Sequence, residues 1–398
     1  MTRRRELLAG SVGLLAALAG CSSGGAQTAT ESTATESESD ATATDEPTAT
    51  ESPTPYSVEI APHGEFTFET VPESYSVIPS VYLDIGMALG IQPTAATDMA
   101  RAPRKLYDIL PDLTFEEEEI TALASGSESG YDKENFYAAA PDVNLIDPRN
   151  LGRFTDWDDA DIQEIENATG PFVASGIRFG PTHPFGNQQD TYYELYDVFE
   201  KVATVFQRQE RFRQWESLHE EFMSNIEAEL PPEDERPSVI PLWRGVDPTT
   251  GQFYLSDVHQ YHNQTKPLER LGLENAYDAE IPGGGYIGYE ELLEYDPDYI
   301  SVGGSLVSST HEEFVDQVVE PFENDPNGQD LTAVQEGNIL RIGDQYQGPI
   351  VDLFATEAVA KMVWPDRFGE WPGPVEDVPE EGQLFDRQRV SDIINGEF

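Results

Sequence analysis

The sequence predicts an α/β protein with two doubly wound lobes of similar topology, joined by a long bridging α-helix, with a ligand cleft between the lobes. Short apolar runs alternate with helical stretches, which is typical of parallel sheets covered by helices. About 340 residues follow a polar N-terminal segment, and one compact core rarely extends over that length. We expect an N-terminal lobe over residues 56–208, the bridging helix over 209–231 and a C-terminal lobe with a C-terminal tail over 232–398.

The first 20 residues have the three parts of an export signal. Arginines 3 to 5 precede an apolar stretch over residues 7–19, which is shorter than the roughly 20 residues that span a membrane. The stretch ends in Leu-Ala-Gly before Cys21, the only cysteine of the chain. The arginine pair resembles that of twin-arginine signals, and the ending resembles a lipobox. We therefore expect cleavage before Cys21, a lipid on its sulfur and anchoring at the extracellular face of the cell membrane.

Residues 21–55, from the lipidated cysteine onward, are predicted to be a disordered tether. The segment consists mainly of Ser, Thr, Ala, Glu, Asp and Pro and has no hydrophobic periodicity. Such a composition buries too little apolar surface to offset the entropy of ordering. The tether would hold the folded body away from the membrane.

Acidic residues dominate the composition. The chain has 75 Asp and Glu against 23 Lys and Arg, which gives a formal net charge of -52. This charge excludes nucleic acid and an anionic membrane surface as partners. Lysine is nearly absent and the acids are spread evenly, which resembles proteins of halophilic archaea. Molar salt reduces the Debye length to about 3 Å and so removes the self-repulsion.

Residues 190–230 contain neither glycine nor proline and predict two consecutive helices. The apolar spacing slips around residues 207–210, so we expect the first helix to end there. The second helix is expected to run for about 20 residues, or about 30 Å, before Pro231 and Pro232 end it. A short closing helix is expected over residues 386–394.

Two segments, one on each side of this helical region, share a pattern. Glu134 stands seven residues before Pro141-Asp142, and Glu290 stands seven residues before Pro297-Asp298. An apolar run follows the Pro-Asp pair in both segments. Each reads as a short helix stopped by proline and followed by a buried parallel strand. The repetition predicts two lobes that are built alike and that present a glutamate at equivalent edges.

These two segments belong to a longer ordered series. Its members are residues 64–68, 76–80, 87–93, 134–146, the helical region 190–230, and residues 236–240, 271–275, 290–302, 331–338 and 364–368. In order and spacing the series resembles the solute-binding proteins of ABC importers for iron-siderophores, haem and cobalamin, the class with a rigid interlobe helix. The resemblance covers about residues 56–370.

The resemblance implies a partner for the two glutamates. In that family one glutamate of each lobe docks to arginines of the membrane permease, and the positions that carry it here are Glu134 and Glu290, with Glu291 as an alternative to Glu290. Two charge-assisted hydrogen bonds, one per lobe, would orient a two-lobed monomer on a two-fold channel. The implied partner is a permease dimer with its ATPase subunits.

Ligand contacts are expected just after the strands, because ligands of doubly wound lobes bind beyond the carboxyl ends of the strands. The candidates are Tyr82, Arg149, Arg178, Trp243, Arg244, Tyr254, Tyr286 and Tyr346. Arginines suit an anionic metal chelate because they bind oxygen acceptors in bidentate geometry. The aromatic residues would supply flat contact area.

The sequence thus predicts a binding protein for an iron(III)-siderophore-like chelate and no enzyme. It contains no H-E-x-x-H, G-x-S-x-G or P-loop motif, and no resident metal or cofactor is expected. Cobalamin or haem is the alternative cargo within the family. A structural or adhesive cell-surface glycoprotein, which the Ser/Thr-rich tether would suit, is the alternative of another class. An exported hydrolase is a third possibility without a matching motif.

Overall fold

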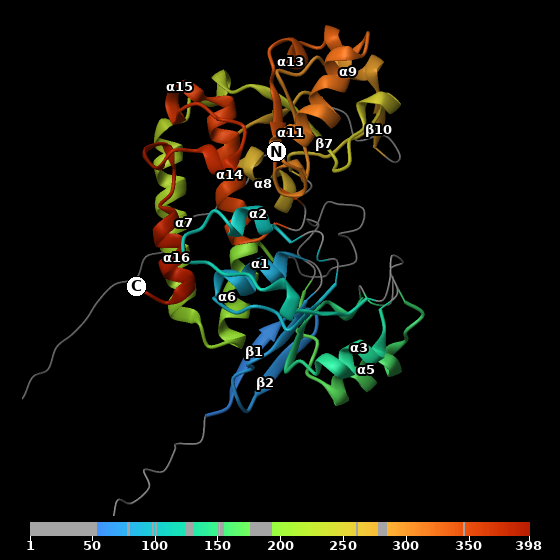
Figure 1. The fold of residues 1–398 in the computed structure, drawn as a ribbon, viewed down its shortest axis with the longest axis vertical. Helices are drawn as coiled ribbons and strands as arrows, with labels where there is room; N and C mark the ends of the chain where they lie inside the picture. The colour runs from blue at the N-terminus through green and yellow to red at the C-terminus, as the bar shows by residue number, and fades with distance from the viewer. Residues whose placement is uncertain are drawn as a thin grey trace, which may run out of the picture. The chain divides into compact units, whose positions relative to one another are not determined.

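The computed structural model describes residues 54–77, 80–97, 99, 102–124, 131–149, 151, 155–175, 193–259, 262–277, 285–344 and 347–398 (Figure 1). The expected signal, Cys21 and nearly all of the tether lie outside these residues. From residue 53 onward the chain forms one compact unit. This unit opens with an antiparallel hairpin of β1 (Tyr56–Ile60) and β2 (Gly64–Phe68). The Tyr56 hydroxyl donates to the carbonyl of Val205 at 2.5 Å and so ties the hairpin to the end of helix α6 (Leu195–Val205).

A first four-stranded sheet follows the hairpin, and its neighbours all pair in parallel in the order β5-β4-β3-β6. The strands are β3 (Tyr75–Val77), β4 (Ala95–Ala96), β5 (Thr121–Ala122) and β6 (Val143–Leu145). The helices of this part are α1 (Ser80–Ala88), α2 (Arg104–Tyr107), α3 (Lys133–Ala139) and α5 (Asp159–Ala168), with a 3₁₀ turn at Glu117–Glu119. Parallel strands need such crossover helices between them.

A second four-stranded parallel sheet has the order β12-β11-β7-β9. Its strands are β7 (Ser238–Leu242), β9 (Glu274–Asn275), β11 (Tyr299–Val302) and β12 (Ile339–Arg341), and β8 (Gln252–Tyr254) pairs separately with β10 (Tyr286–Gly288). The helices are α8 (His262–Arg270), α9 (Tyr289–Tyr295), α10 (Ser305–Ser308), α11 (His311–Phe314), α12 (Glu320–Asn324) and α13 (Thr332–Gln335). Short helical turns lie at Glu233–Glu235, Pro248–Thr250 and Gly328–Asp330, and a π-helical turn at Val315–Val319. Two parallel sheets with covering helices confirm the predicted fold class.

Two helices stand between the sheets in the sequence. They are α6 (Leu195–Val205) and α7 (Gln209–Glu229), and the chain between them turns at Gln207, whose φ is +53°. Trp215 of α7 is fully buried and donates its indole N–H to the carbonyl of Ala88 at 2.8 Å. The prediction of two helices, with the break near residue 207 and the end before Pro231, is confirmed.

The C-terminal segment packs on α7. It contains α14 (Pro349–Val363), α15 (Pro365–Phe368), the 3₁₀ turns Val375–Asp377 and Glu380–Gly382, and the closing helix α16 (Arg387–Asn395). In Figure 1 α16 runs beside α7, and Arg389 of α16 forms an ion pair of 2.6 Å with Glu221 of α7. The closing helix thus agrees with the prediction to within one residue at each end.

Helix α14 is buried along nearly its whole length, and a carboxylate from α1 caps its N-terminus. The Oδ2 atom of Asp84 accepts hydrogen bonds from the backbone N–H groups of Ile350 at 2.9 Å and Val351 at 3.2 Å. The Tyr107 hydroxyl donates to Oδ1 of the same carboxyl at 2.8 Å. A carboxylate at this position satisfies helix N–H groups that have no partner within the helix. The first and last parts of the folded unit are therefore joined through one buried side chain.

Candidate ligand-binding site

Three predicted aromatic contacts form a continuous row in the C-terminal lobe. Trp243 follows β7 directly, and its backbone N–H donates to the carbonyl of Tyr254 at 2.8 Å. Tyr254 lies opposite Tyr286 in the β8–β10 pair. The ring centroids are 5.8 Å apart for Trp243 and Tyr254 and 5.0 Å apart for Tyr254 and Tyr286, both in edge-on geometry. Tyr286 is 64% exposed, so the row leads from the end of a core strand to the surface.

Arg244 lies next to this row and is paired with an aspartate. Its Nη1 atom is 3.3 Å from Oδ2 of Asp344, which follows β12. The side chain of Asp344 is 10% exposed and that of Arg244 is 29% exposed. Gly304, which follows β11, leaves the space for this pair, because a Cβ atom there would lie 2.9 Å from the Asp344 oxygen. The ends of three parallel strands therefore converge on one anchored guanidinium.

The N-terminal lobe has a similar pair at the end of β6. The Arg149 side chain donates from Nε at 2.9 Å and from Nη2 at 2.6 Å to the carboxylate of Asp147. The backbone N–H of Arg149 donates to the same carboxylate at 3.0 Å. Asp147 is buried, and His63 lies nearby with Nε2 at 3.8 Å from its Oδ1. Burial lowers the pKa of His63, although the neighbouring Asp147 raises it. The buried aspartate fixes the orientation of the half-buried guanidinium.

The two predicted edge glutamates occupy equivalent places. Helices α3 and α9 each have seven residues, and Glu134 and Glu290 are the second residue of each. Both side chains are exposed. Glu291 differs, because its carboxylate accepts the backbone N–H of Gly288 at 2.9 Å and so caps its own helix. Glu290 is therefore the structural counterpart of Glu134.

After each of these helices, a serine-aspartate clamp joins the starts of two neighbouring strands. Oδ2 of Asp142 accepts hydrogen bonds from the backbone N–H of Ser74 at 3.0 Å and from its hydroxyl at 2.9 Å. Oδ2 of Asp298 accepts the same two bonds from Ser238, at 2.8 and 2.7 Å. The serine precedes β3 in one lobe and begins β7 in the other, and each strand pairs in parallel with the strand after the aspartate. The repeat seen in the sequence is thus a repeat in three dimensions.

The chain is similar in sequence to known binding proteins. A family model described as "Periplasmic binding protein" matches residues 134–346, which is more than half of the chain. The chain belongs to the periplasmic binding protein family. The Fe(3+)-citrate-binding protein YfmC of Bacillus subtilis is 22% identical over 278 residues, which are 69% of this chain and 75% of that protein. The family consists of binding proteins, so the chain is a binding protein and not an enzyme.

Solved structures of other periplasmic binding proteins share the fold. A solute-binding protein of Mycobacterium smegmatis has a TM-score of 0.55 at 14% identity, over 78% of this chain and 97% of its own. The triscatecholate siderophore-binding protein FeuA of Bacillus subtilis, solved with ferri-bacillibactin, has a TM-score of 0.52 at 16% identity, over 77% and 98%. The catecholate-siderophore-binding protein VctP of Vibrio cholerae has a TM-score of 0.52 at 15% identity, over 78% and 99%.

One predicted ligand contact of this binding protein needs correction. Tyr82 lies in α1 and is only 2% exposed. Its hydroxyl donates to the carbonyl of Ser175 at 2.5 Å and accepts the backbone N–H of Ser175 at 2.9 Å. Burial raises the pKa of Tyr82. Its hydroxyl both donates to and accepts from the buried backbone of Ser175, so Tyr82 is no ligand contact in this structure. Arg178 and Tyr346 lie outside the described residues.

The two anchoring aspartates were missed in the sequence. Asp147 and Asp344 follow β6 and β12 and so satisfy the positional rule that selected the arginines. Acids are so frequent in this chain that their position alone does not distinguish them.

Among the described residues no group of three or more His, Cys, Asp and Glu side chains is arranged to hold a metal ion. No helix in the described part of the chain is both long and apolar enough to span a membrane.

Proposed function

We propose that this protein is the extracytoplasmic solute-binding component of an ABC importer and that it captures an iron(III) chelate of the siderophore type. The observation that carries the proposal is the pair of anchored arginines, Arg149 and Arg244, one at the strand ends of each lobe. In a chain with a net charge of -52, arginines at the ligand edge favour an anionic ligand. The ligands of YfmC, FeuA and VctP, which are ferric citrate and catecholate siderophores, support the same ligand class.

Each part of the site has a task in this proposal. Arg149 and Arg244 would donate charge-assisted hydrogen bonds to oxygen atoms of the chelate, and the aspartates hold both guanidinium groups in place before the ligand arrives. The row of Trp243, Tyr254 and Tyr286 would contact the organic part of the chelate, because aromatic side chains offer large contact area at low entropic cost. The iron would stay within its chelate, so the protein needs no metal ligand of its own.

The arginine assignment is tested with Arg244→Gln. Loss of one charge-assisted hydrogen bond costs about 1.5 to 3 kcal/mol, so the affinity for the preferred ferric chelate should fall at least about tenfold. The matched control is Arg213→Gln, the same change on the exposed face of α7, which should bind as the wild type does. Equal affinities for both variants and the wild type would remove Arg244 from the site.

For docking, we propose that Glu134 and Glu290 bind arginines of the membrane permease. Their equivalent places on α3 and α9 and their exposure support this role. The double variant Glu134→Arg, Glu290→Arg should lose transport and keep its ligand affinity, because neither glutamate is one of the proposed ligand contacts. Glu294→Arg, at another exposed position of α9, is the matched control. Uptake by the double variant at the control's rate would contradict the docking role.

The N-terminal residues complete the proposal. We propose that the signal over residues 1–20 is removed and that Cys21 carries the lipid that anchors the protein outside the cell membrane. The even acidity favours a halophilic cell. Cys21→Ala should release the protein from washed membranes into the medium, whereas retention on the membrane would contradict lipid anchoring at this residue. We also propose that the lobes comprise residues 56–208 and 232–398, with the bridging helix over 209–231.

A further inference from the structure

A cavity of about 530 Å³ lies beside β12, the edge strand of the second sheet, and is separate from the proposed ligand contacts. The π-helical turn Val315–Val319 and the chain around α15 form its other walls. None of Trp243, Arg244, Tyr254 and Tyr286 lines it. Its volume is in the usual range for small-molecule sites, and single π-helical turns occur often at functional sites.

Arg341, the last residue of β12, is the principal polar group of this cavity. It is 4% exposed, and its guanidinium donates to the backbone carbonyls of Gly373 at 3.3 Å, Ser305 at 3.0 Å and Ser309 at 2.6 Å. Among the described residues no carboxylate forms an ion pair with it, and its Nε–H has no acceptor. Burial lowers the pKa of Arg341 to about 10, although Glu376 raises it. A buried cation without a counter-ion favours an anion beside it.

The same cavity is lined by further residues with side-chain nitrogen atoms, among them His311, Lys361 and Trp371. In the described part of the chain the indole nitrogen of Trp371 and Nδ1 of His311 are buried and have no hydrogen-bond partner. The ammonium of Lys361 donates to the carbonyl of Phe368 at 2.6 Å. A buried donor without an acceptor costs about 1 to 3 kcal/mol, so the indole N–H of Trp371 favours a ligand with acceptor atoms. Of the lining residues that the structure describes, Glu370 is the only carboxylate, although the chain is strongly acidic.

Most of the remaining lining is apolar, with Asn338 and Tyr299 as polar exceptions. The apolar part comprises Phe314, Val315, Val319, Ile339, Leu340, Met362 and two prolines, 365 and 372. The Arg341 guanidinium lies 5.6 Å from the centre of the Phe314 ring, so the cation and the apolar wall adjoin. A metal cation does not suit this lining, because Arg341 and Lys361 bring two positive charges to it and Glu370 is its one described carboxylate. A small inorganic anion would leave the apolar surface without contact.

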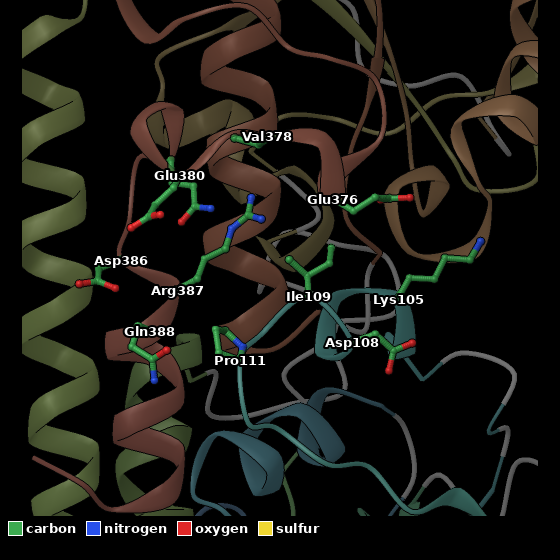
Figure 2. Close-up of a pocket in the computed structure, with 11 residues that line it drawn as sticks. Lys105, Asp108, Ile109, Pro111, Glu376, Val378, Glu380, Asp386, Arg387 and Gln388 are labelled. Carbon is green, nitrogen blue, oxygen red and sulfur yellow. The ribbon is translucent and has the colours of Figure 1, made fainter.

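Another cavity shows the contrast. It measures about 670 Å³ and lies between the α2 segment, with Lys105 and Asp108, and the C-terminal segment around Arg387 (Figure 2). Arg387 is buried as well, but its Nη2 atom is 3.3 Å from a buried carboxylate, that of Glu357. Three further acids line that cavity, at positions 376, 380 and 386. Arg387 therefore already has a counter-ion, whereas Arg341 has none among the described residues.

We propose that the cavity beside β12 is a second binding site, for a small molecule that carries one carboxylate on an apolar or aromatic body. The carboxylate binds Arg341, with the indole N–H of Trp371 as a further donor, and the body lies against Phe314 and the π-helical turn. Arg341 ends β12, and Asp344, which holds Arg244, follows three residues later. The second site is therefore close in the chain to the proposed ligand contacts.

The test uses the full-length protein with ¹⁵N-labelled tryptophan and follows the indole N–H signals by NMR. The chain has five tryptophans, and the Trp371→Phe variant identifies the signal of Trp371. The probe is 1-naphthoate, and its two halves, acetate and 1-methylnaphthalene, are the controls. We expect a saturable shift of the Trp371 signal with 1-naphthoate and at least about tenfold weaker binding of both controls.

Variants add a second readout. Arg341→Gln should weaken 1-naphthoate at least about tenfold, while Arg367→Gln, an exposed arginine of the nearby α15, should not. If Arg341→Gln fails to fold, the comparison of probes on the wild type still decides. The absence of a saturable shift at Trp371, or 1-methylnaphthalene binding as tightly as 1-naphthoate, would overturn the proposal.

Discussion

Replacing Asp84 with asparagine should change how the stability of this protein depends on pH. Asp84 is fully buried and caps α14 through the N–H groups of Ile350 and Val351. Asparagine has the same shape, and its carbonyl oxygen accepts those two bonds, while its amide can face Tyr107. The variant therefore removes the ionisation of one group and makes the Tyr107 hydroxyl an acceptor instead of a donor, a change that does not depend on pH.

The magnitude follows from the pKa of this carboxyl. Burial raises the pKa of Asp84 from 3.8 to about 7, although Tyr107 and the helix N–H groups hold it down. Between these values the native state binds one more proton than the unfolded state, so the free energy of unfolding falls as the pH rises. The contribution is fully present below about pH 4 and is lost by about pH 7. At 1.36 kcal/mol per unit it amounts to about 4 kcal/mol.

Urea denaturation in constant molar KCl at pH 4, 6 and 8 measures this effect. The stability of the wild type, relative to Asp84→Asn, should fall by about 4 kcal/mol from pH 4 to pH 8. Asp108→Asn, at the exposed end of α2, corrects for the loss of one negative charge. Parallel pH profiles for the wild type and Asp84→Asn would refute the reasoning, because they would mean that Asp84 titrates alike in both states.

Two further substitutions test the packing around the site. Gly304→Ala should cost about 1 to 3 kcal/mol of stability and weaken ligand binding, because Gly304 has a φ of +74° and a Cβ atom there would press on Asp344. Thermal unfolding measures the stability and a ligand titration the affinity; an unchanged affinity would mean that Asp344 does not position Arg244 for the ligand. Trp215→Phe should lower the free energy of unfolding by about 1 to 3 kcal/mol without changing ligand affinity, since it removes the donor to the carbonyl of Ala88. Urea denaturation measures this, and an unchanged stability would mean that the hydrogen bond does not stabilise the fold.

The long-range architecture was predictable because it follows from local signals. The 3.6-residue spacing of α7 and its stop at Pro231 define the helix, and the repeated Glu-x6-Pro-Asp pattern marks equivalent positions in both lobes. Proline and helix periodicity act within a few residues, so one sequence suffices to interpret them. The clamps of Asp142 and Asp298 also lie within this pattern, although their serine partners are distant in the chain.

The site was less predictable, because it depends on which side chains meet across the fold. Tyr82 follows a predicted strand, as a ligand contact would, but α1 turns its ring into the core, where it binds the backbone of Ser175. Asp84, two residues later, caps a helix that begins 265 residues further along the chain. A pairing at that separation leaves no trace in local periodicity. In so acidic a chain, the composition also conceals Asp147 and Asp344 among ordinary surface carboxylates.

The most direct test of the proposed function is a titration of intrinsic fluorescence in molar KCl. The full-length protein is titrated with ferric hydroxamates, ferric catecholates, ferric citrate, haem and cobalamin, with each iron-free chelator as its control, and Trp243 at the strand end serves as the reporter. The account predicts saturable quenching by one ferric chelate at sub-micromolar concentration and much weaker binding of its iron-free chelator. Saturation by haem or cobalamin alone, or no response to any ferric chelate, would contradict it.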